Sequence, residues 1–320
     1  MTNRPASPLI SCVVPAYNEA GNIEAFVLAL RGWLLDGGHR FEIIVVNDGS
    51  KDQTQTILDK LVAEDKIACL EFSRNFGKEA ALTAGIEHAR GDIVILMDSD
   101  FQHPIPVIGE FLAKWRDGYD MVYGLRRNRN EESVRKRLGT KLFYAIMSRG
   151  SSIDIPPDAG DFRLMDRKAV DALKQLPERS RFMKGLYAWV GFKSTPVYFD
   201  VEPRFAGVSS FNYKSLTRLA ITGLTAFSDL PLRIWAGMGV LVSIFALIYA
   251  AYITVRTLIL GVDVPGWATL TVAILFFSGI QLISIGILGE YIARIFNEVK
   301  GRPTYLVARK SGFAKDESQA

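Results

Sequence analysis

The chain has 320 residues and a formal net charge of +4 at pH 7, an excess too mild to indicate nucleic-acid binding. The basic residues gather in two stretches, which favours a phosphate group or an anionic membrane surface as partner. The only two cysteines, Cys12 and Cys69, lie in apolar runs, which argues against a disulfide framework and fits a reducing compartment. Residues 1–8 lack the apolar core of a signal peptide, so we expect the N-terminal part in the cytosol.

Five strands are expected to alternate with helices in the first 126 residues. The apolar patterns predict strands at residues 9–14, 41–46, 67–72, 93–97 and 121–123. Between them they predict helices at about 20–35, 52–63, 78–89 and 105–115, the second of them capped by Ser50. This alternation is typical of a parallel, doubly wound, Rossmann-like α/β sheet of the nucleotide-binding kind.

Polar or charged side chains follow all five predicted strands. They are Asn18 and Glu19, then Asp48, then Arg74 and Lys78, then Asp98 and Asp100, and last Arg126 and Arg127. Because the carboxyl ends of parallel strands meet at one edge of a sheet, we expect these groups to frame a crevice. The crevice would have an acidic half and a basic half, as a metal-bound diphosphate requires.

Asp98 and Asp100 end the fourth strand, one residue apart. Two carboxylates at such a place can hold a hard divalent cation together with substrate phosphates. The alternative is that Asp100 only begins the turn into the helix that Pro104 opens. The pair alone leaves both interpretations open, and the polar ends of the other four strands favour the metal.

Other common site patterns are missing from the sequence. No G-x-G-x-x-G opens the first helix, and Gly77-Lys78 lacks the upstream glycine of a phosphate-binding loop, which argues against dinucleotide dehydrogenases and ordinary NTPases. The three histidines make no zinc pattern, and we expect His39 and His88 at the surface; His103 is left open because it neighbours Asp98 and Asp100.

Two segments in the last third are predicted to form a transmembrane hairpin. Residues 234–255 and 267–289 carry no ionisable side chain, and each can cross about 30 Å of hydrocarbon. The loop between them has little positive charge, whereas Arg233, Arg294, Lys300 and Arg302 flank the pair, so both termini are expected in the cytoplasm. Amphipathic runs at 138–147 and 214–227 are expected to pack on the core or lie on the bilayer. Residues 305–307 are expected as a short strand.

The predicted organisation therefore has four parts. A cytoplasmic α/β domain covers residues 1–213, and a juxtamembrane amphipathic helix covers 214–230. A membrane-embedded hairpin covers 231–296, and a cytoplasmic tail covers 297–320.

Five motifs together resemble family 2 glycosyltransferases that act on polyprenyl phosphates. They are V-P-A-Y-N-E at 14–19, V-N-D-G-S at 46–50, R-N-F-G-K-E at 74–79, D-S-D-F-Q-H-P at 98–104 and G-D-F-R-L-M at 160–165. The resemblance covers nearly the whole chain and is greatest to the bactoprenol glucosyltransferases, with dolichyl-phosphate mannose synthases more distant. It implies a GT-A fold, a nucleotide-sugar donor, Mg²⁺ or Mn²⁺, and a polyprenyl-phosphate acceptor in the bacterial inner membrane. It leaves a homo-oligomer open.

Carried over position by position, the resemblance also implies a set of site residues. Those for the nucleotide sugar are Pro15, Tyr17, Glu19, Asp48, Lys78 and Asp98, and those for the metal are Asp98, Asp100 and Gln102. Those for the lipid phosphate are Arg126, Arg127, Arg135, Lys136, Arg204 and Lys214, and the catalytic candidates are Asp100, Asp161 and Arg126. Ser210 stands where relatives usually carry Lys, so Arg204 or Lys214 is expected to replace that contact.

We predict an inverting transfer of a hexose to the acceptor phosphate, giving a lipid-linked sugar for the cell envelope. UDP-glucose is the first candidate donor; GDP-mannose or a UDP-amino sugar is the alternative. A phosphate monoester, with a second pKa of about 6, is mostly dianionic at neutral pH, so Asp161 is expected to position or stabilise rather than act as an obligatory base. A capping role for Asp161 in the next turn is the alternative.

Two functions of other classes remain to be weighed. One is a non-catalytic membrane scaffold that binds a sugar nucleotide, against which the retention of Asp48, Asp98, Asp100 and Gln102 argues. The other is a processive polysaccharide synthase, against which the chain has no Q-x-x-R-W motif and too few transmembrane helices for a pore.

Overall fold

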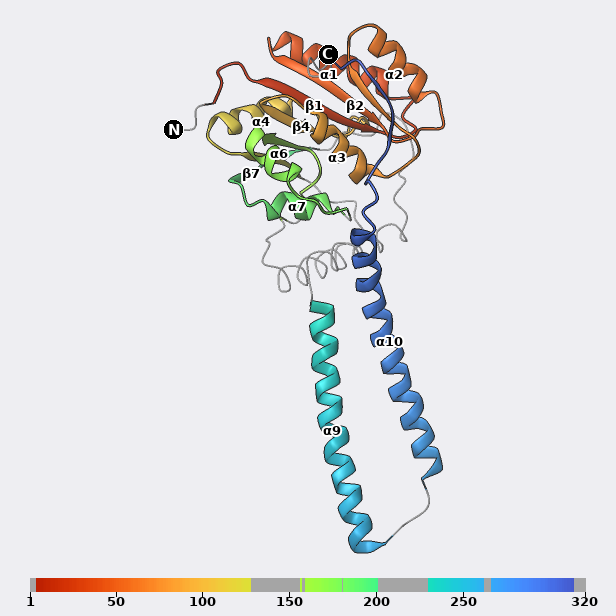
Figure 1. Ribbon diagram of the computed structural model, residues 1–320. Coiled ribbons are helices and arrows are strands. Elements are labelled where there is room, and N and C mark those ends of the chain that lie inside the picture. The colour runs from red at the N-terminus through yellow and green to blue at the C-terminus, as the bar shows by residue number, and fades with distance from the viewer. Residues whose placement is uncertain are drawn as a thin grey trace.

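The computed structural model describes residues 4–127, 156, 159–179, 181–200, 230–261 and 266–313. Both predicted amphipathic runs, at 138–147 and 214–227, lie outside these residues, as do Arg135, Lys136, Arg204, Ser210 and Lys214. Within the described part, a mixed sheet carries helices on both faces, and two long helices extend away from it (Figure 1).

The elements follow the expected alternation through the first 126 residues, with ends shifted by up to three positions. The strands are β1 (Leu9–Ala16), β2 (Arg40–Asn47), β3 (Ala68–Phe72), β4 (Ile93–Leu96), β5 (Met121–Arg126), β6 (Arg163–Asp166), β7 (Ser194–Phe199) and β8 (Val307–Ser311). The helices are α1 (Ile23–Asp36), α2 (Thr54–Ala63), α3 (Lys78–His88), α4 (Val107–Arg116), α6 (Arg167–Lys174), α7 (Met183–Trp189), α9 (Leu230–Leu260) and α10 (Trp267–Val299).

The five strands predicted in the first 126 residues, β1 to β5, run parallel to one another as expected, but the sheet also contains two antiparallel strands. The strand order is β7-β5-β6-β4-β1-β2-β3-β8, and β6 runs antiparallel to both β4 and β5. The last strand, β8, begins at Val307 rather than Tyr305 and runs antiparallel to β3 at the sheet edge. Neither strand belongs to the regular alternation of strand and helix, so the local pattern held no signal for its direction.

Each face of the sheet has its own apolar core. On one face, α1, α2 and α4 cover β-strand side chains such as Ile10, Cys12 and Ile95, all fully buried. On the other face, α3, α6 and α7 cover Val13 and Leu96. A strand buried on both faces reads as a continuous apolar run, which explains why β1, β2 and β4 were recognisable from sequence.

A close approach of α3 to β1 depends on Gly85. A Cβ atom added at Gly85 would lie 2.1 Å from Cγ1 of Val13, whose side chain is fully buried. We expect Gly85→Ala to lower the free energy of unfolding by about 1–3 kcal/mol, because an atom forced into a filled core displaces its neighbours. Urea unfolding of the detergent-solubilised protein, followed by tryptophan fluorescence, measures the loss.

The matched control is Gly32→Ala in α1, where an added Cβ would meet nothing within 4 Å. There the change should be neutral or stabilising by up to about 1 kcal/mol, because alanine is the better helix former. Equal effects of the two substitutions would show that the contact with Val13 is not the cause.

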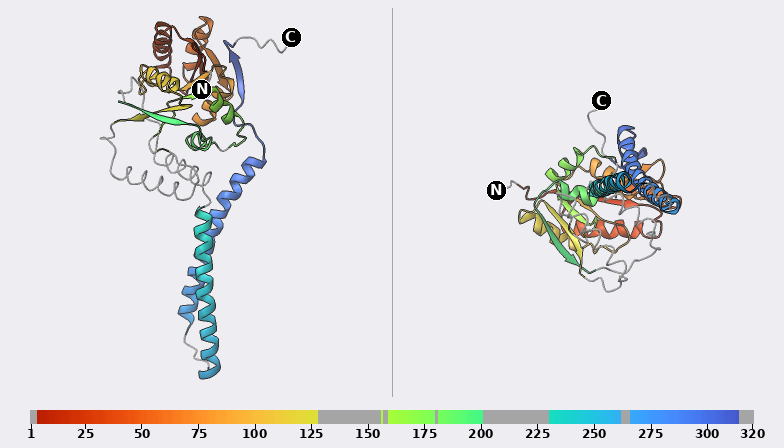
Figure 2. Two further views of the ribbon diagram at one scale, coloured as in Figure 1. Left: turned by 90° about the vertical axis from the view of Figure 1, so that its left-hand side faces the viewer. Right: turned by 90° about the horizontal axis from the view of Figure 1, so that it is seen from below.

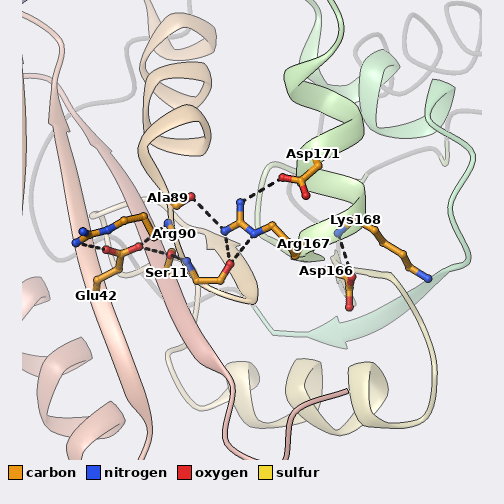
Figure 3. A network of polar contacts seen from close by, with 9 residues as sticks. Ser11, Glu42, Ala89, Arg90, Asp166, Arg167, Lys168 and Asp171 are labelled. Carbon is orange, nitrogen blue, oxygen red and sulfur yellow. Dashed lines mark hydrogen bonds and ion pairs between the residues drawn. The ribbon is translucent and has the colours of Figure 1, made fainter. Parts of the chain in front are cut away.

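A network of polar contacts closes the edge of the sheet where β1 and β2 begin (Figure 3). The Ser11 hydroxyl donates to Glu42 Oε1 and accepts from the Gly91 backbone N–H at 2.8 Å. Arg167, the first residue of α6, donates to the carbonyls of Gly91 and Ala89. These groups satisfy one another, so the amino ends of these strands are held by structural contacts and leave the carboxyl ends for ligand chemistry.

By length and composition, α9 and α10 each contain a segment able to cross a membrane. The segments are Ile234–Ile253 and Val272–Val299. Leu241 and Leu247 of α9 are 70% and 71% exposed, a state that suits hydrocarbon rather than water. The two helices lie beside each other and extend away from the sheet in the views of both Figure 1 and Figure 2.

Candidate active site

The loops at the carboxyl ends of β1 and β2 are joined to each other. The Asn18 backbone N–H donates to Ser50 Oγ at 3.0 Å, and its side-chain oxygen accepts from the Lys51 N–H at 2.8 Å. The expected capping of α2 by Ser50 is therefore wrong, because its hydroxyl serves this junction; Asp52 accepts from the Thr54 N–H instead. Asn18 has a φ of +55°, one of three non-glycine residues with positive φ in the described chain.

Of the residues predicted for the nucleotide sugar, three come from β1 and its loop. Pro15 lies within β1, and Tyr17 is 42% exposed beyond its end. Glu19 accepts a hydrogen bond from the Asn22 amide at 2.9 Å, and its own backbone N–H donates to Thr54 Oγ1 at 2.9 Å. The backbone that carries the exposed Tyr17 ring is thus fixed by β1 on one side and by the hydrogen bonds of Glu19 on the other.

Asp48 organises the loop that leads from β3 into α3. It is only 3% exposed, and its two oxygens accept from the backbone N–H groups of Phe76 at 2.6 Å and Gly77 at 2.9 Å. Burial raises the pKa of the Asp48 carboxyl, against the opposite effect of these two N–H groups and of Arg74. Asp48 therefore places the start of α3, and with it Lys78, at the carboxyl end of the strands.

Lys78 lies between two of the predicted site carboxylates. Its Nζ is 2.7 Å from Asp98 Oδ1 and 3.1 Å from Asp161 Oδ2. The insertion of β6 beside β4 makes this possible, since Asp161 stands just before β6 and Asp98 just after β4. The crevice was expected to have separate acidic and basic halves. Here the basic Lys78 instead lies between the two carboxylates, because two carboxylates this close need a cation between them.

All three groups are ionised at neutral pH. Burial works against the charged lysine, but the carboxylates of Asp98 and Asp161 outweigh it and raise the pKa of Lys78. Burial likewise opposes the charge of Asp161, but Lys78, Lys184 and Arg163 outweigh it and lower the pKa of Asp161 to about 2. The pKa of Asp98 is also lowered, since the charge of Lys78 overcomes burial.

The loop after β4 brings together the remaining metal candidates. Asp100 Oδ1 accepts from the Gln102 backbone N–H at 3.0 Å, and the next residue, His103, is buried with its ring stacked on Phe162 at 4.7 Å. Within the described residues, no three His, Cys, Asp or Glu side chains group as a metal site. Magnesium is often held by only one or two carboxylates with substrate phosphates. The hard oxygen donors of Asp98, Asp100 and Gln102, all in one short loop, fit that mode.

The two arginines predicted for the lipid phosphate end β5 at the same edge. Both are exposed, and Arg127 Nη1 lies 3.5 Å from Asp200 Oδ2. Arg126 has no ion pair within the described residues. The other four predicted phosphate contacts lie outside those residues.

Sequence reasoning missed a group of residues behind Asp161. Arg163 is 4% exposed, its guanidinium lies 3.5 Å from the centre of the Tyr187 ring, and its Nη2 donates to the Gly160 carbonyl at 2.6 Å. Arg163 stands two residues after Asp161 in the same G-D-F-R-L-M motif, so the sequence placed it close to Asp161 along the chain. Tyr187, from α7, had no such signal.

Glu79 is the second missed residue, and it suggests a pH test. Its Oε2 accepts from the Met183 N–H at 3.1 Å, and burial, followed by the charge of Asp161, raises the pKa of Glu79 from 4.5 to about 7. Between these pH values the folded protein holds a proton that the unfolded chain has released. The contribution of this proton to stability is therefore present below pH 4.5 and is lost as pH rises to about 7.

We expect Glu79→Gln to remove this part of the decline in stability with pH. Thermal unfolding of the detergent-solubilised protein, measured at intervals from pH 5 to about 8, should show a flatter dependence for the variant. A Glu87→Gln substitution, on the same helix, is the control. Parallel curves for wild type and Glu79→Gln would contradict the assignment.

Comparison with known proteins decides the family. Residues 11–174 match the model described as glycosyl transferase family 2, and residues 230–295 match the one described as the GtrB C-terminal hairpin. The chain belongs to glycosyl transferase family 2. Together with the mixed sheet, this match confirms the expected GT-A fold and identifies the protein as a glycosyltransferase.

Two relatives match nearly the whole chain, and one solved structure matches part of it. An uncharacterised glycosyltransferase of Synechocystis sp. is 50% identical over 93% of this chain and 94% of its own length. The bactoprenol glucosyl transferase of Shigella phage SfII is 44% identical over 94% and 97% of the two chains. A solved glucosyl-3-phosphoglycerate synthase of Mycobacterium tuberculosis, with Mn²⁺, UDP and glucosyl-3-phosphoglycerate, is 21% identical over 69% and 78% of the two chains, with a TM-score of 0.48.

Proposed function

We propose that this family 2 glycosyltransferase transfers a hexose from a nucleotide sugar to a polyprenyl phosphate with inversion, and that UDP-glucose is the first donor to test. The observation that carries the proposal is the Asp98–Lys78–Asp161 cluster at the carboxyl ends of the strands, in a chain that also has two helices long and apolar enough to cross a membrane. The likeness to the Shigella phage bactoprenol glucosyl transferase supports the acceptor class.

The donor is proposed to lie along the loops after β1, β2 and β4. Pro15, Tyr17, Glu19 and Asp48 would hold the nucleoside end, and Asp98, Asp100 and Gln102 would hold a divalent metal. When bound, Mg²⁺ or Mn²⁺ offsets the negative charge that develops on the departing diphosphate. Lys78 adds a fixed positive charge beside one of these carboxylates, 2.7 Å from Asp98.

Asp161 is proposed as an electrostatic and positioning group. A carboxyl whose pKa is lowered to about 2 stays ionised at neutral pH and is a weak base. The acceptor phosphate is mostly dianionic at that pH and needs little activation, so a weak base suffices. The fixed negative charge can instead stabilise the positive charge that grows on the sugar as the glycosidic bond breaks.

The acceptor phosphate is proposed to meet Arg126 and Arg127 at the end of β5. The sequence adds four further basic residues to the proposed contacts of the lipid phosphate: Arg135, Lys136, Arg204 and Lys214. The start of α9 and the end of α10 lie on the side of the sheet domain (Figure 1). That arrangement supports a hairpin in the plasma membrane of a bacterium, with the sheet domain and both termini in the cytoplasm.

The test is direct transfer to the lipid. Purified protein would be incubated with undecaprenyl phosphate, Mg²⁺ and, in turn, radiolabelled UDP-glucose, UDP-galactose, GDP-mannose or a UDP-amino sugar. One donor should give a lipid-linked sugar, and repeating the assay with Mn²⁺ decides the preferred metal. Donor binding without any lipid-linked product would favour the sugar-nucleotide scaffold instead.

A further inference from the structure

The segment between α6 and α7 contacts the end of α10 through Arg179. The Arg179 backbone N–H donates to the Glu298 carboxylate, at 3.0 Å to Oε1 and 3.1 Å to Oε2. The guanidinium donates from Nε to the Arg302 carbonyl at 2.9 Å and from Nη2 to the Gly301 carbonyl at 3.2 Å. One residue of the sheet domain therefore binds three positions around the end of the second membrane-spanning helix.

The end of α10 is shaped for this contact. The helix stops at Val299, and Gly301 follows it with a φ of +67°, the left-handed conformation in which helices often end. Glu298 stands in the last turn, where the negative end of the helix dipole disfavours a carboxylate. A backbone N–H donated from another element to Glu298 offsets that cost, which accounts for an acidic residue at this place.

The other end of the same segment reaches the candidate active site. Arg181 donates to the carbonyls of Leu176 at 2.7 Å and Glu178 at 3.0 Å, and it lies 3.4 Å from Thr83 Oγ1 in α3. Met183, the first residue of α7, donates its N–H to Glu79 at 3.1 Å. Glu79 follows Lys78 directly, so contacts on either side of residue 180, which lies outside the described residues, link the end of α10 with the cation between Asp98 and Asp161.

We propose that Arg179 is a positioning residue that fixes the end of α10 against the segment between α6 and α7. It would thereby set the distance of Lys78 and Asp161 from an acceptor held in the bilayer. The inference rests on the proposed function. A lipid phosphate is confined to the membrane interface, so its reach to the site depends on how the sheet domain sits on the hairpin. Small displacements of reacting groups are costly in rate. A soluble donor has no such dependence.

A second link between the tail and the sheet domain provides the control. Arg309 of β8 binds Asp59 of α2 at 2.7 Å and Glu71 of β3 at 2.9 Å. Tyr305 stacks on Phe72 with ring centres 5.0 Å apart. These contacts keep the tail attached when Arg179 is changed, so Arg179→Gln should loosen the placement of α10 without detaching it.

The experiment compares wild type, Arg179→Gln, Arg179→Lys and Arg309→Gln with two forms of acceptor. One form is undecaprenyl phosphate in nanodiscs, and the other is a short-chain polyprenyl phosphate in detergent micelles. Arg179→Gln should raise the KM for the nanodisc acceptor by about fivefold, as expected for loss of about 1 kcal/mol, and leave the donor KM and the micelle KM unchanged. Arg179→Lys should restore only part of the loss, because a lysine ammonium group keeps the charge but lacks the planar guanidinium geometry that donates to two carbonyls at once. Arg309→Gln should change neither KM.

Hydrogen exchange gives a readout that needs no turnover. In Arg179→Gln, the backbone amides of residues 178, 179, 181–183, 301 and 302 should exchange faster than in wild type, and in Arg309→Gln they should not. Unchanged exchange, or an equal rise of KM in nanodiscs and micelles, would overturn the role of Arg179. Absence of transfer by wild type would instead contradict the proposed function, while the exchange result still decides whether Arg179 holds α10.

Discussion

Replacing Lys78 with Met is expected to lower kcat by about 10²-fold or more, a loss of the size seen when one preorganised charged or polar group is removed from an active site. The reason is local, since Nζ of Lys78 lies 2.7 Å from Asp98 and 3.1 Å from Asp161. Without this cation, the two carboxylates repel each other and lose the partner that orients them. The kcat for lipid-linked sugar and the binding constant of the donor, measured separately, distinguish turnover from binding.

The same substitution should lower stability only moderately. Breaking a fully buried ion pair costs about 3–5 kcal/mol. The Lys78 side chain is 40% exposed, so solvent screening reduces this to about 1–2 kcal/mol. The control is the double variant Lys78→Met/Asp161→Asn, which removes the repulsion as well as the cation. It should regain stability without regaining activity; a double variant that recovers turnover would contradict the role of Lys78.

Acid stability should change in the same variant. In wild type the pKa of Asp161 is lowered from 3.8 to about 2, so its contribution to stability is present above pH 3.8 and is lost as pH falls toward 2. Lys78→Met removes the main cause of that shift. The variant should therefore lack this stabilisation above pH 3.8, and its acid-unfolding curve should begin at higher pH than that of wild type.

Replacing Asp100 with Asn is expected to lower turnover by about 10³-fold while the fold stays intact, since the metal's stabilisation of the leaving diphosphate is worth several kcal/mol. Asn keeps the oxygen that accepts from the Gln102 N–H at 3.0 Å, so the loop after β4 should hold its shape. It removes the negative charge proposed to bind the metal. The rate of transfer would be measured over a series of Mg²⁺ and Mn²⁺ concentrations, with circular dichroism to check folding.

Ser99→Ala is the matched control for this loop. Ser99 stands between the two aspartates and is only 2% exposed, so the change alters the same segment without touching its charge. Its turnover should stay close to that of wild type. If Asp100→Asn also turned over at the wild-type rate at every metal concentration, Asp100 would not be a metal ligand.

The described fold followed from sequence wherever the signal was local. Strands such as residues 93–96 are continuous apolar runs, and the helices between them carry apolar residues at helical spacing. Side chains at the ends of successive parallel strands meet at one edge, so the nearness of Asp48, Asp98 and Lys78 was also predictable. The directions of β6 and β8 were not, because a strand's neighbour is chosen by tertiary packing.

The segment from Ile93 to Asp100 illustrates what the sequence determines and what only the tertiary structure determines. The apolar run and the two carboxylates were sufficient to predict a buried strand that ends in a site, and the motifs around it identified the family. The sequence by itself therefore determined the element order, the two long apolar helices and the residues to inspect, because these depend on neighbours along the chain. The placement of Lys78 between Asp98 and Asp161, and the binding of Arg179 to Glu298 across 119 positions, were decided only by the tertiary structure. Such contacts join residues far apart in the chain, and their free energy arises only after the sheet has brought them together.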